Sequence, residues 1–382
     1  MKNQIISNHF IKRIGFSQDQ LKQALEQISI SFSLGSISST HGIEEGYEDV
    51  NIKITTTKGH YLCKFLVNFI TKKSRTLKEA QYYAYVIEQL AKGGLRVPNL
   101  LSTTAGSKLY KISIKNLNPI HVLVMEFFEG KHFLEIAPTI KDMQNITLIL
   151  KQLHSLDFPL QDHICDDPWQ PQFLHKYYKK HANILPPKEK LILKKTVQKL
   201  KLLDLNKYKK TPTHGDIMRN NILKNSKGEY CLLDFGVIAN NYWIIDLALF
   251  LAGFCLDPKL NIKTNQKILN KVINTYLKHR KIKKEITDDL NLLITASYSA
   301  FYLAATLEKI MENNFSDENM YWINLGREGM QMMKSIENYT ISPNTSSNFK
   351  KPAEAFRCPP FLISLKSAPS FSAINFVCST GT

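Results

Sequence analysis

The sequence predicts an α+β fold of two lobes, a small antiparallel-sheet lobe followed by a larger, mainly helical one. Short β-rich runs separated by Gly, Asp, Glu and Lys turns fill residues 28–70, a pattern typical of antiparallel strands. Beyond Gly130 the apolar residues recur three to four positions apart, as in amphipathic helices. A chain of 382 residues that is 43% hydrophobic is long enough for a large buried core. We therefore expect residues 1–129 to form the first lobe and 130–340 the second.

The first lobe is expected to combine one sheet with two helices. Its first helix covers "SQDQLKQALEQI", where Ser17 and Gln20 stand in capping-box register. Strands are then predicted in "ISISFSL", "VNIKITT" and "HYLCKFLV". A long helix follows, with Ser74 as candidate N-cap and Gly93 at its end, and two more strands lie in "LYKISI" and "HVLVMEFF".

The second lobe is expected to be built from helices interrupted once. Helical spacing marks "TIKDMQNITLILKQLHSL", "PWQPQFLHKYYKKHANIL" and the lysine-rich "KKTVQKLKLL". Residues 213–236 interrupt this pattern with a loop, a strand "NILK", a turn "NSKGE" and a strand "YCLLDF". Helices then resume to about Glu337. Residues 341–382 are rich in Ser, Pro, Asn and Thr and are predicted to be a disordered tail.

Charge and cysteine content narrow the functional class. The 50 basic and 33 acidic residues give a net charge of +17, which would suit an anionic partner. Much of the excess is Lys in helical patterns, which favours solvated helix faces over a nucleic-acid-binding patch. The six cysteines show no C-x-x-C spacing, and no run approaches the ~18 apolar residues of a membrane span. We expect a cytoplasmic protein that binds neither nucleic acid nor membrane.

The stretch "THGDIMRNNILKNSKGEYCLLDFG" contains the residues with the clearest chemical interpretation. Phosphoryl transfer from ATP needs a carboxylate that orients the attacking hydroxyl and oxygen ligands for Mg²⁺. Asp216 follows a tight loop at Gly215 and is predicted to accept the substrate proton. Asn221, five residues later, and Asp234, at the end of the hairpin, are predicted to hold the metal. The alternative is an acidic turn that only caps a hairpin.

Two motifs in this stretch resemble a known superfamily. His214, Gly215, Asp216 and Asn221 spell H-G-D-x-x-x-x-N, and Asp234 begins a D-F-G motif. Together they resemble the aminoglycoside phosphotransferase, choline kinase and type II homoserine kinase superfamily. The resemblance implies a bilobal protein-kinase-like fold, ATP and Mg²⁺ as cofactors, and a small-molecule hydroxyl as acceptor.

The same resemblance implies roles in the first lobe. Lys64 in "YLCKF" matches the lysine that contacts the ATP phosphates, and Glu79 is its expected ion-pair partner, ahead of Glu88. The main chain from Glu126 to Phe128 matches the segment that receives adenine. No G-x-G-x-x-G precedes them. Small residues in its place either approach phosphate through their backbone or form a plain surface hairpin, and both interpretations stay open. These residues are Ser36, Ser38, Ser39, Gly42 and Gly46.

Among these kinases, the type II homoserine kinases resemble the chain most. "GYEDVNIKITTTKGHYL" is similar to their G-I-E-N-x-N-Y-x-V-T-T-x-x-G-x-Y-V pattern, and Arg219 matches an arginine of their catalytic loop. Arg219 is therefore the candidate substrate residue, the alternative being a solvent-facing loop arginine. Asn220 and the D-F-G motif depart from their pattern. Asp246 is interpreted as a brace of the catalytic loop, and His154 as a packed core histidine.

Homoserine is the first predicted acceptor, and an aminoglycoside, choline or another amino alcohol or sugar is the alternative. A nucleotide-binding pseudokinase with a regulatory role is a second class, which the intact Asp216, Asn221 and Asp234 disfavour. A protein kinase is disfavoured because no A-P-E-like motif ends an activation segment. The sequence leaves the oligomeric state open.

Overall fold

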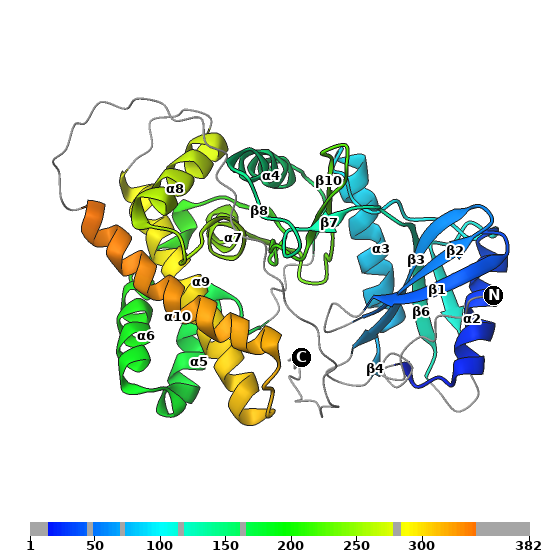
Figure 1. Cartoon of the computed structure of the whole chain (residues 1–382), viewed down its shortest axis with the longest axis horizontal. Helices are drawn as coiled ribbons and strands as arrows, with labels where there is room; N and C mark the ends of the chain where they lie inside the picture. The colour runs from blue at the N-terminus through cyan, green and yellow to red at the C-terminus, as the bar shows by residue number, and fades with distance from the viewer. Residues whose placement is uncertain are drawn as a thin grey trace. The chain divides into compact units, whose positions relative to one another are not determined.

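The structure is a computed structural model that describes residues 14–43, 49–68, 73–113, 118–160, 166–277 and 284–340. Its contacts divide the chain into two compact units (Figure 1). Of the described residues, unit 1 contains those up to Gly130 together with Asn225–Phe235, and unit 2 contains Lys131–Lys224 and those from Gly236 to Thr340. The predicted tail, residues 341–382, lies outside the described residues.

Unit 1 begins with helix α2 (Gln18–Ser31), and its predicted capping box is confirmed. The Ser17 hydroxyl accepts the Gln20 N–H, and the Gln20 side chain accepts the Ser17 N–H at 2.7 Å. The strand predicted in "ISISFSL" is wrong, because its first residues continue this helix. Ile28 and Ser29 extend the buried stripe that Leu21 starts, so burial of the helix face outweighs the β preference of branched residues.

An antiparallel sheet forms the centre of unit 1, with strand order β1-β2-β3-β6-β5 and β4 paired to β3. The strands are β1 (Ile37–Ile43), β2 (Val50–Thr56), β3 (Gly59–Asn68), β4 (Lys73–Ser74), β5 (Leu109–Ile112) and β6 (Ile120–Glu126). Side chains of β2 alternate between buried and half-buried, and Val50, Ile52 and Ile54 pack in the same apolar core as α2. Register places Lys64 opposite Asn51 on β2 and Leu123 on β6, in the middle of the sheet.

Helix α3 (Leu77–Lys92) confirms the predicted long helix but not its N-cap. Ser74 is paired with Val67 in β4, and Thr76 caps the helix instead. The Thr76 hydroxyl accepts the Glu79 N–H, and the Glu79 carboxylate accepts the Thr76 N–H at 2.7 Å. The expected Gly93 follows as C-cap.

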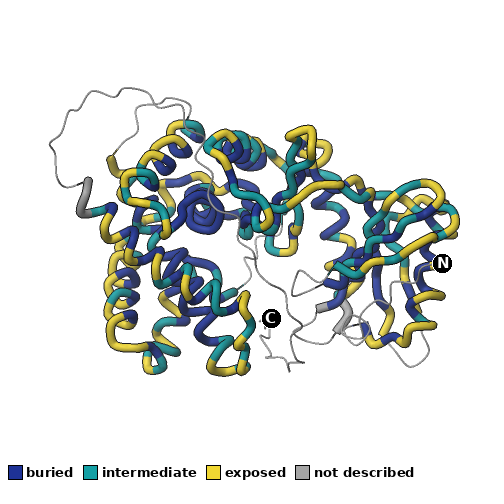
Figure 2. Tube along the Cα trace, viewed as in Figure 1, coloured by how far each residue is buried: buried dark blue, intermediate teal, exposed yellow. Residues whose placement is uncertain are grey.

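Unit 2 is mainly helical. Its helices are α4 (Ile140–Leu153), α5 (Leu174–His181), α6 (Pro187–Leu200), α7 (Trp243–Phe250), α8 (Ile262–Leu277), α9 (Lys284–Met311) and α10 (Asp317–Thr340). Helix α9 packs against α6, α7 and α10 and contributes three large buried aromatics, Tyr298, Phe301 and Tyr302. Figure 2 shows the dark core that runs along α7. By length and composition α9 is apolar enough to cross a membrane, but 89% of its apolar window is buried inside the protein.

Short strands hold the loop that carries the predicted catalytic residues. Strand β8 (Lys210–Thr213) precedes the loop and pairs antiparallel with β11 (Ala239–Tyr242), a strand that the sequence did not predict. Strand β9 (Ile222–Lys224) follows the loop and pairs with β7 (Lys131–His132). The second hairpin strand, β10 (Tyr230–Leu232), belongs to unit 1, where the Leu232 N–H donates to the Arg96 carbonyl at 3.0 Å.

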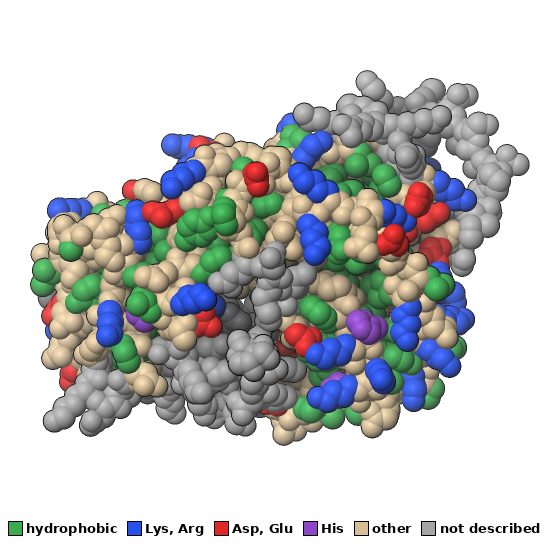
Figure 3. All heavy atoms as spheres, turned by 180° about the vertical axis from the view of Figure 1, so that it is seen from behind, with side chains coloured by type: hydrophobic (Ala, Val, Ile, Leu, Met, Phe, Trp, Pro, Cys, Tyr) green, Lys and Arg blue, Asp and Glu red, His purple; other side chains and the backbone are tan. Residues whose placement is uncertain are grey.

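On the face that Figure 3 presents, basic side chains are interspersed with acidic ones. Several lysines are paired, such as Lys207 with Glu285 and Asp289. This arrangement is the one expected of solvated helix faces.

Candidate active site

The loop between β8 and β9 begins with a glycine that its conformation requires. Gly215 has a φ of +78°, and a Cβ at this position would lie 3.1 Å from the carbonyl oxygen of Val237. Both the left-handed backbone and the close approach of a second chain segment disfavour a side chain here. The tight turn delivers Asp216 to the half-buried position directly after it.

Asp216 and Asn221 lie side by side, as the motif predicts. The Asn221 amide nitrogen donates to the Asp216 carboxylate at 2.7 Å and to the Asp216 carbonyl at 2.9 Å. These bonds hold the half-buried carboxylate in place and use the amide nitrogen of Asn221 as a donor. The amide oxygen is therefore the Asn221 atom suited to a cation.

Asp246 on α7 braces the catalytic loop, as expected. Its carboxylate is 1% exposed and accepts the N–H groups of His214 and Gly215, each at 2.8 Å. The His154 ring contacts the same carboxylate at 2.9 Å and Tyr276 at 2.6 Å, which confirms it as a packed core histidine. Burial by itself raises the pKa of Asp246, but His154 and the loop donors hold it below its usual value.

Lys64 is paired, but not with the residue that the sequence predicts. Its ammonium lies 3.0 Å from the Asp49 carboxylate, and both side chains are almost fully buried. Glu79 is exposed, and its carboxylate accepts the N–H and hydroxyl of Thr76 at the start of α3. The expected Lys64–Glu79 pair is therefore corrected: Glu79 serves its own helix terminus, and Asp49 pairs with Lys64.

Asp49 is the residue that the sequence reasoning missed in unit 1. Because Asn51 lies opposite Lys64 and side chains alternate along a strand, Asp49 is on the same face as Lys64 and diagonal to it. The signal in the sequence was the carboxylate of Asp49, two residues before Asn51, which pairs with Lys64. This signal can be recognised only when the register of β2 and β3 is known.

Asp234 also lies in unit 1, at an exposed turn after β10 with a φ of +56°. This backbone conformation is uncommon for a residue with a side chain, although Asp tolerates it better than most. The Phe235 N–H donates to the Tyr83 hydroxyl of α3 at 3.4 Å. Burial lowers the pKa of Lys64, but Asp49, Tyr83 and Asp234 together raise it above its usual value. Lys64 and Asp234 thus act on each other electrostatically.

The segment predicted to receive adenine ends strand β6. The N–H of Glu126 donates to the Asn99 carbonyl and that of Phe127 to the His60 carbonyl, both at 3.0 Å. These two N–H groups already have partners, so the adenine prediction relies on the other main-chain groups of residues 126–128.

The segment before Lys64 forms two antiparallel strands in its described part, with a shift of register between Ile37 and Ser39. Strand β1 pairs with β2 from Ile37 to Ile43, and the Ser38 hydroxyl donates to the Thr55 carbonyl at 3.1 Å. Gly46, the last of the small residues predicted to approach phosphate, lies outside the described residues.

The predicted metal ligands offer the chemistry that Mg²⁺ prefers. An amide oxygen from Asn221 and a carboxylate from Asp234 are hard oxygen donors, and Mg²⁺ commonly keeps several waters beside one or two protein ligands. In the described part of the chain, no cluster of three or more His, Cys, Asp or Glu side chains suits a metal ion. The role of Asn221 and Asp234 as Mg²⁺ ligands stays a prediction.

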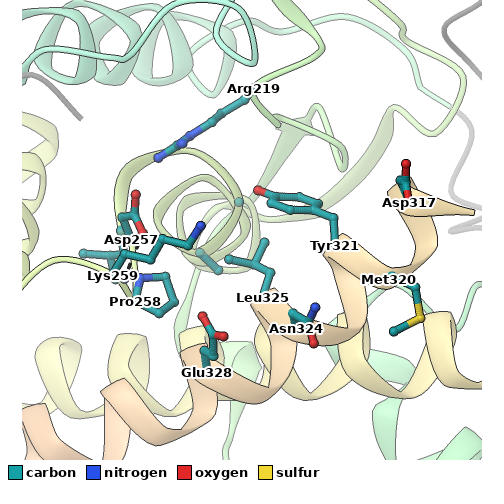
Figure 4. A pocket seen from close by; sticks show the side chains of 13 residues that line it. Arg219, Asp257, Pro258, Lys259, Asp317, Met320, Tyr321, Asn324, Leu325 and Glu328 are labelled. Carbon is teal, nitrogen blue, oxygen red and sulfur yellow. Dashed lines mark hydrogen bonds between the residues drawn. The ribbon is translucent and has the colours of Figure 1, made fainter. Parts of the chain in front are cut away.

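A cavity of about 350 Å³ lies within unit 2 and is lined by charges of both signs (Figure 4). Arg219 reaches it from the catalytic loop, Asp257 and Lys259 from the turn after α7, and Tyr321 and Glu328 from α10. Its other lining residues are Ala252, Gly253, Leu256, Pro258, Asp317, Met320, Asn324 and Leu325. Apart from Arg219, the sequence predicted no role for the polar residues here, because the turn after α7 and helix α10 are about 40 and about a hundred residues away from Arg219 along the chain.

Arg219 is buried, so its interpretation as a solvent-facing loop arginine is wrong. It is 8% exposed, and its Nε donates to the Phe254 carbonyl at 3.0 Å. Phe254 lies in a π-helical turn, Leu251–Cys255, that extends α7. In the same turn, a Cβ on Gly253 would lie 1.9 Å from the Met218 sulfur, so the loop and α7 touch at a glycine.

Comparisons with known proteins agree with this geometry. The pattern of the phosphotransferase enzyme family matches residues 39–268, more than half of the chain. The chain belongs to this phosphotransferase enzyme family. A homoserine kinase of Methylobacterium radiotolerans is 24% identical over 242 residues, which cover 62% of this phosphotransferase and 70% of the relative.

Solved structures of similar fold include other kinases. A microcompartment-associated aminopropanol kinase matches with a TM-score of 0.60 and 13% identity, over 83% of this chain and 98% of its own. An amicoumacin kinase in complex with AMP-PNP and Ca²⁺ matches with a TM-score of 0.56 and 14% identity, over 84% and 95%. The predicted superfamily, the kinase-like α+β fold and the ATP-dependent phosphotransferase activity are thereby confirmed.

Proposed function

We propose that this small-molecule phosphotransferase transfers the γ-phosphate of ATP to the hydroxyl of homoserine or a similar amino acid. The observation that carries the proposal is the cavity of mixed charge reached by Arg219 from the catalytic loop. A free amino acid bears a carboxylate and an ammonium, so it needs a cationic and an anionic group in one site. Arg219 and Lys259 supply the first kind, and Asp257 and Glu328 the second.

The proposed roles at the transferred group follow from the loop geometry. Asp216, held by Asn221, orients the acceptor hydroxyl and takes its proton as the oxygen attacks phosphorus. Asp246 fixes the two backbone N–H groups just before Asp216 and so limits the positions that its carboxylate can adopt. Lys64 contacts the ATP phosphates, and Glu126 and Phe128 receive the adenine through their main chain.

Asn221 and Asp234 are the proposed ligands of Mg²⁺, which neutralises negative charge on the phosphates when bound. A solved kinase of similar fold contains AMP-PNP and Ca²⁺, which supports the use of a nucleotide with a divalent cation here. The homoserine kinase relative supports homoserine as the acceptor. The solved structure of similar fold that is named an aminopropanol kinase supports an amino alcohol as the alternative.

The deciding experiment is an acceptor panel. ATP consumption and phosphorylated product are measured with homoserine, aminopropanol, choline and an aminoglycoside, and homoserine is expected to react fastest. Asp216→Asn should lower that rate by about 10³-fold or more with little change in the melting temperature. No turnover with any acceptor would sink the proposal and revive the nucleotide-binding pseudokinase. Turnover with an unchanged rate in Asp216→Asn would instead remove Asp216 from its proposed role.

The cavity is tested separately through the exposed Lys259. Lys259→Gln removes one cation without disturbing the core, so the KM for homoserine should rise about tenfold while the KM for ATP stays within twofold. If the KM for homoserine does not change, homoserine does not bind beside Lys259. A preference for choline or the aminoglycoside would contradict homoserine as the acceptor.

A further inference from the structure

Lys64 forms a buried ionic group with Asp49 and Arg75, which the resemblance to known kinases did not anticipate. The Asp49 carboxylate, 2% exposed at its side chain, contacts the Lys64 ammonium at 3.0 Å. Arg75 approaches the same carboxylate with Nε at 3.2 Å from one oxygen and a terminal nitrogen at 3.4 Å from the other. The guanidinium fork therefore fixes the plane of the carboxylate that holds Lys64.

The three residues come from separate parts of unit 1. Asp49 stands just before β2, Lys64 in β3, and Arg75 between β4 and α3. The Tyr83 ring of α3 lies 5.3 Å from the Lys64 ammonium and 6.0 Å from the Arg75 guanidinium. Lys64 is thus packed between a carboxylate and an aromatic face, which restricts its long side chain to few rotamers.

The alternative partner on α3 is committed elsewhere. Glu79 completes the capping box of its helix through three hydrogen bonds with Thr76. Moving Glu79 to Lys64 would release a helix cap, which contributes about 1 kcal/mol. Asp49 would still be paired with Arg75 and would stay beside Lys64. A second carboxylate next to a lysine that is already paired would add little stability. The geometry therefore favours Asp49 as the lasting partner.

We propose that Asp49 is the positioning residue for Lys64, in the place that the kinase resemblance gives to a glutamate of the following helix. The inference rests on the proposed function, because it takes Lys64 as the group that contacts the ATP phosphates. Asp49 does not touch ATP itself. It holds the ammonium at one point, and a displacement of about 1 Å in such a group lowers a rate by up to ~10²-fold.

The test is a double-mutant cycle on the full chain with ATP and the best acceptor of the panel. Lys64→Met should lower kcat by about 10²-fold or more, and Asp49→Asn by about 10- to 100-fold. If Asp49 acts through Lys64, adding Asp49→Asn to Lys64→Met should change kcat by less than about threefold. Additive losses would mean that Asp49 contributes only to general stability, and would overturn the proposal.

Nucleotide binding separates positioning from loss of structure. Asp49→Asn leaves the charge of Lys64 in place but no longer fixes its position. The Kd for ATP should therefore change by less than about threefold while kcat falls. Glu79→Gln is the competing variant and should keep kcat within twofold. A loss in Glu79→Gln larger than that in Asp49→Asn would assign the position to α3 instead.

The same variants distinguish a failure of the Lys64 role from a failure of the Asp49 role. If Asp49→Asn does not fold, Asp49→Glu enters the same cycle, since it keeps the charge and moves it by one methylene, and the same lack of additivity is expected. If Lys64→Met leaves kcat unchanged, the proposed role of Lys64 fails. If Lys64→Met is slow and Asp49→Asn is as fast as the wild type, only the inference about Asp49 fails.

Discussion

Replacing Asp246 by Asn is the sharpest test of how the catalytic loop is held. One Asp246 oxygen accepts the Gly215 N–H, and the other accepts the His214 N–H and contacts the His154 ring. An asparagine has one acceptor oxygen, so in either orientation its NH₂ group faces at least one donor. That donor is left unsatisfied at about 1–3 kcal/mol, and the remaining bonds lose their ionic strengthening. We expect a loss of about 3 kcal/mol in the free energy of unfolding.

The change should also reach catalysis, because Gly215 carries Asp216. With one N–H released, the turn loosens and kcat should fall about 10- to 100-fold. Urea unfolding and steady-state kinetics measure the two effects. Asp142→Asn is the matched control, since Asp142 is equally buried in the same unit and its carboxylate accepts from Thr139 and Lys224. It should lose stability and keep kcat within twofold.

The pH dependence gives an independent check. The pKa of Asp246 is lowered in the folded protein, so its ionised form contributes stability at pH values above the unfolded pKa of about 4. That contribution is lost as pH falls through the folded pKa. The difference in unfolding free energy between wild type and Asp246→Asn should therefore be constant near neutrality and shrink below about pH 4. A stability loss under 1 kcal/mol with unchanged kcat, or equal kcat losses in both variants, would refute the reasoning.

Three other predictions address the loop, its support and the core. Gly215→Ala forces a side chain into a left-handed turn beside the Val237 carbonyl, so it should cost about 1–3 kcal/mol and lower kcat; a neutral variant would contradict the turn geometry. Gly253→Ala meets the Met218 sulfur and should destabilise by about 1–3 kcal/mol in thermal unfolding, unless the loop does not approach α7 as described. Burial raises the pKa of Glu308 to about 7, so the wild type loses stability as the pH rises from about 4.5 to 7. Glu308→Gln should therefore be the more stable by about 2 kcal/mol at pH 8 and show no such gain at pH 4, and equal stability at pH 8 would contradict the shift.

Where the sequence predicted well, the signal was local. The capping box of Ser17, the strand that carries Lys64 and the helix that bears Asp246 are each set by residues within one turn or one strand. The catalytic motif is local in the same sense, since Asn221 returns to Asp216 over five residues. Such patterns need no knowledge of distant contacts.

Where the sequence failed, a distant contact outweighed the local signal. The run after Ile28 has strand-forming residues, but its buried face extends α2. Glu79 stands at the expected place on α3, but the same position is the third residue of a helix whose cap needs a carboxylate. The run after Ile28 suits a strand or a helix, and Glu79 suits an ion pair or a helix cap. The packing of the unit determines which of the two forms.

The family, the reaction type and the candidates Asp216, Asn221, Asp234 and Lys64 could be read from the sequence alone, because they rest on motifs whose members are close along the chain. The pairing of Asp49 with Lys64 could be seen only in the folded chain. The same is true of the burial of Arg219 beside a charged cavity shared with α10. Those two arrangements depend on strand register and helix packing, which join residues that no short pattern connects.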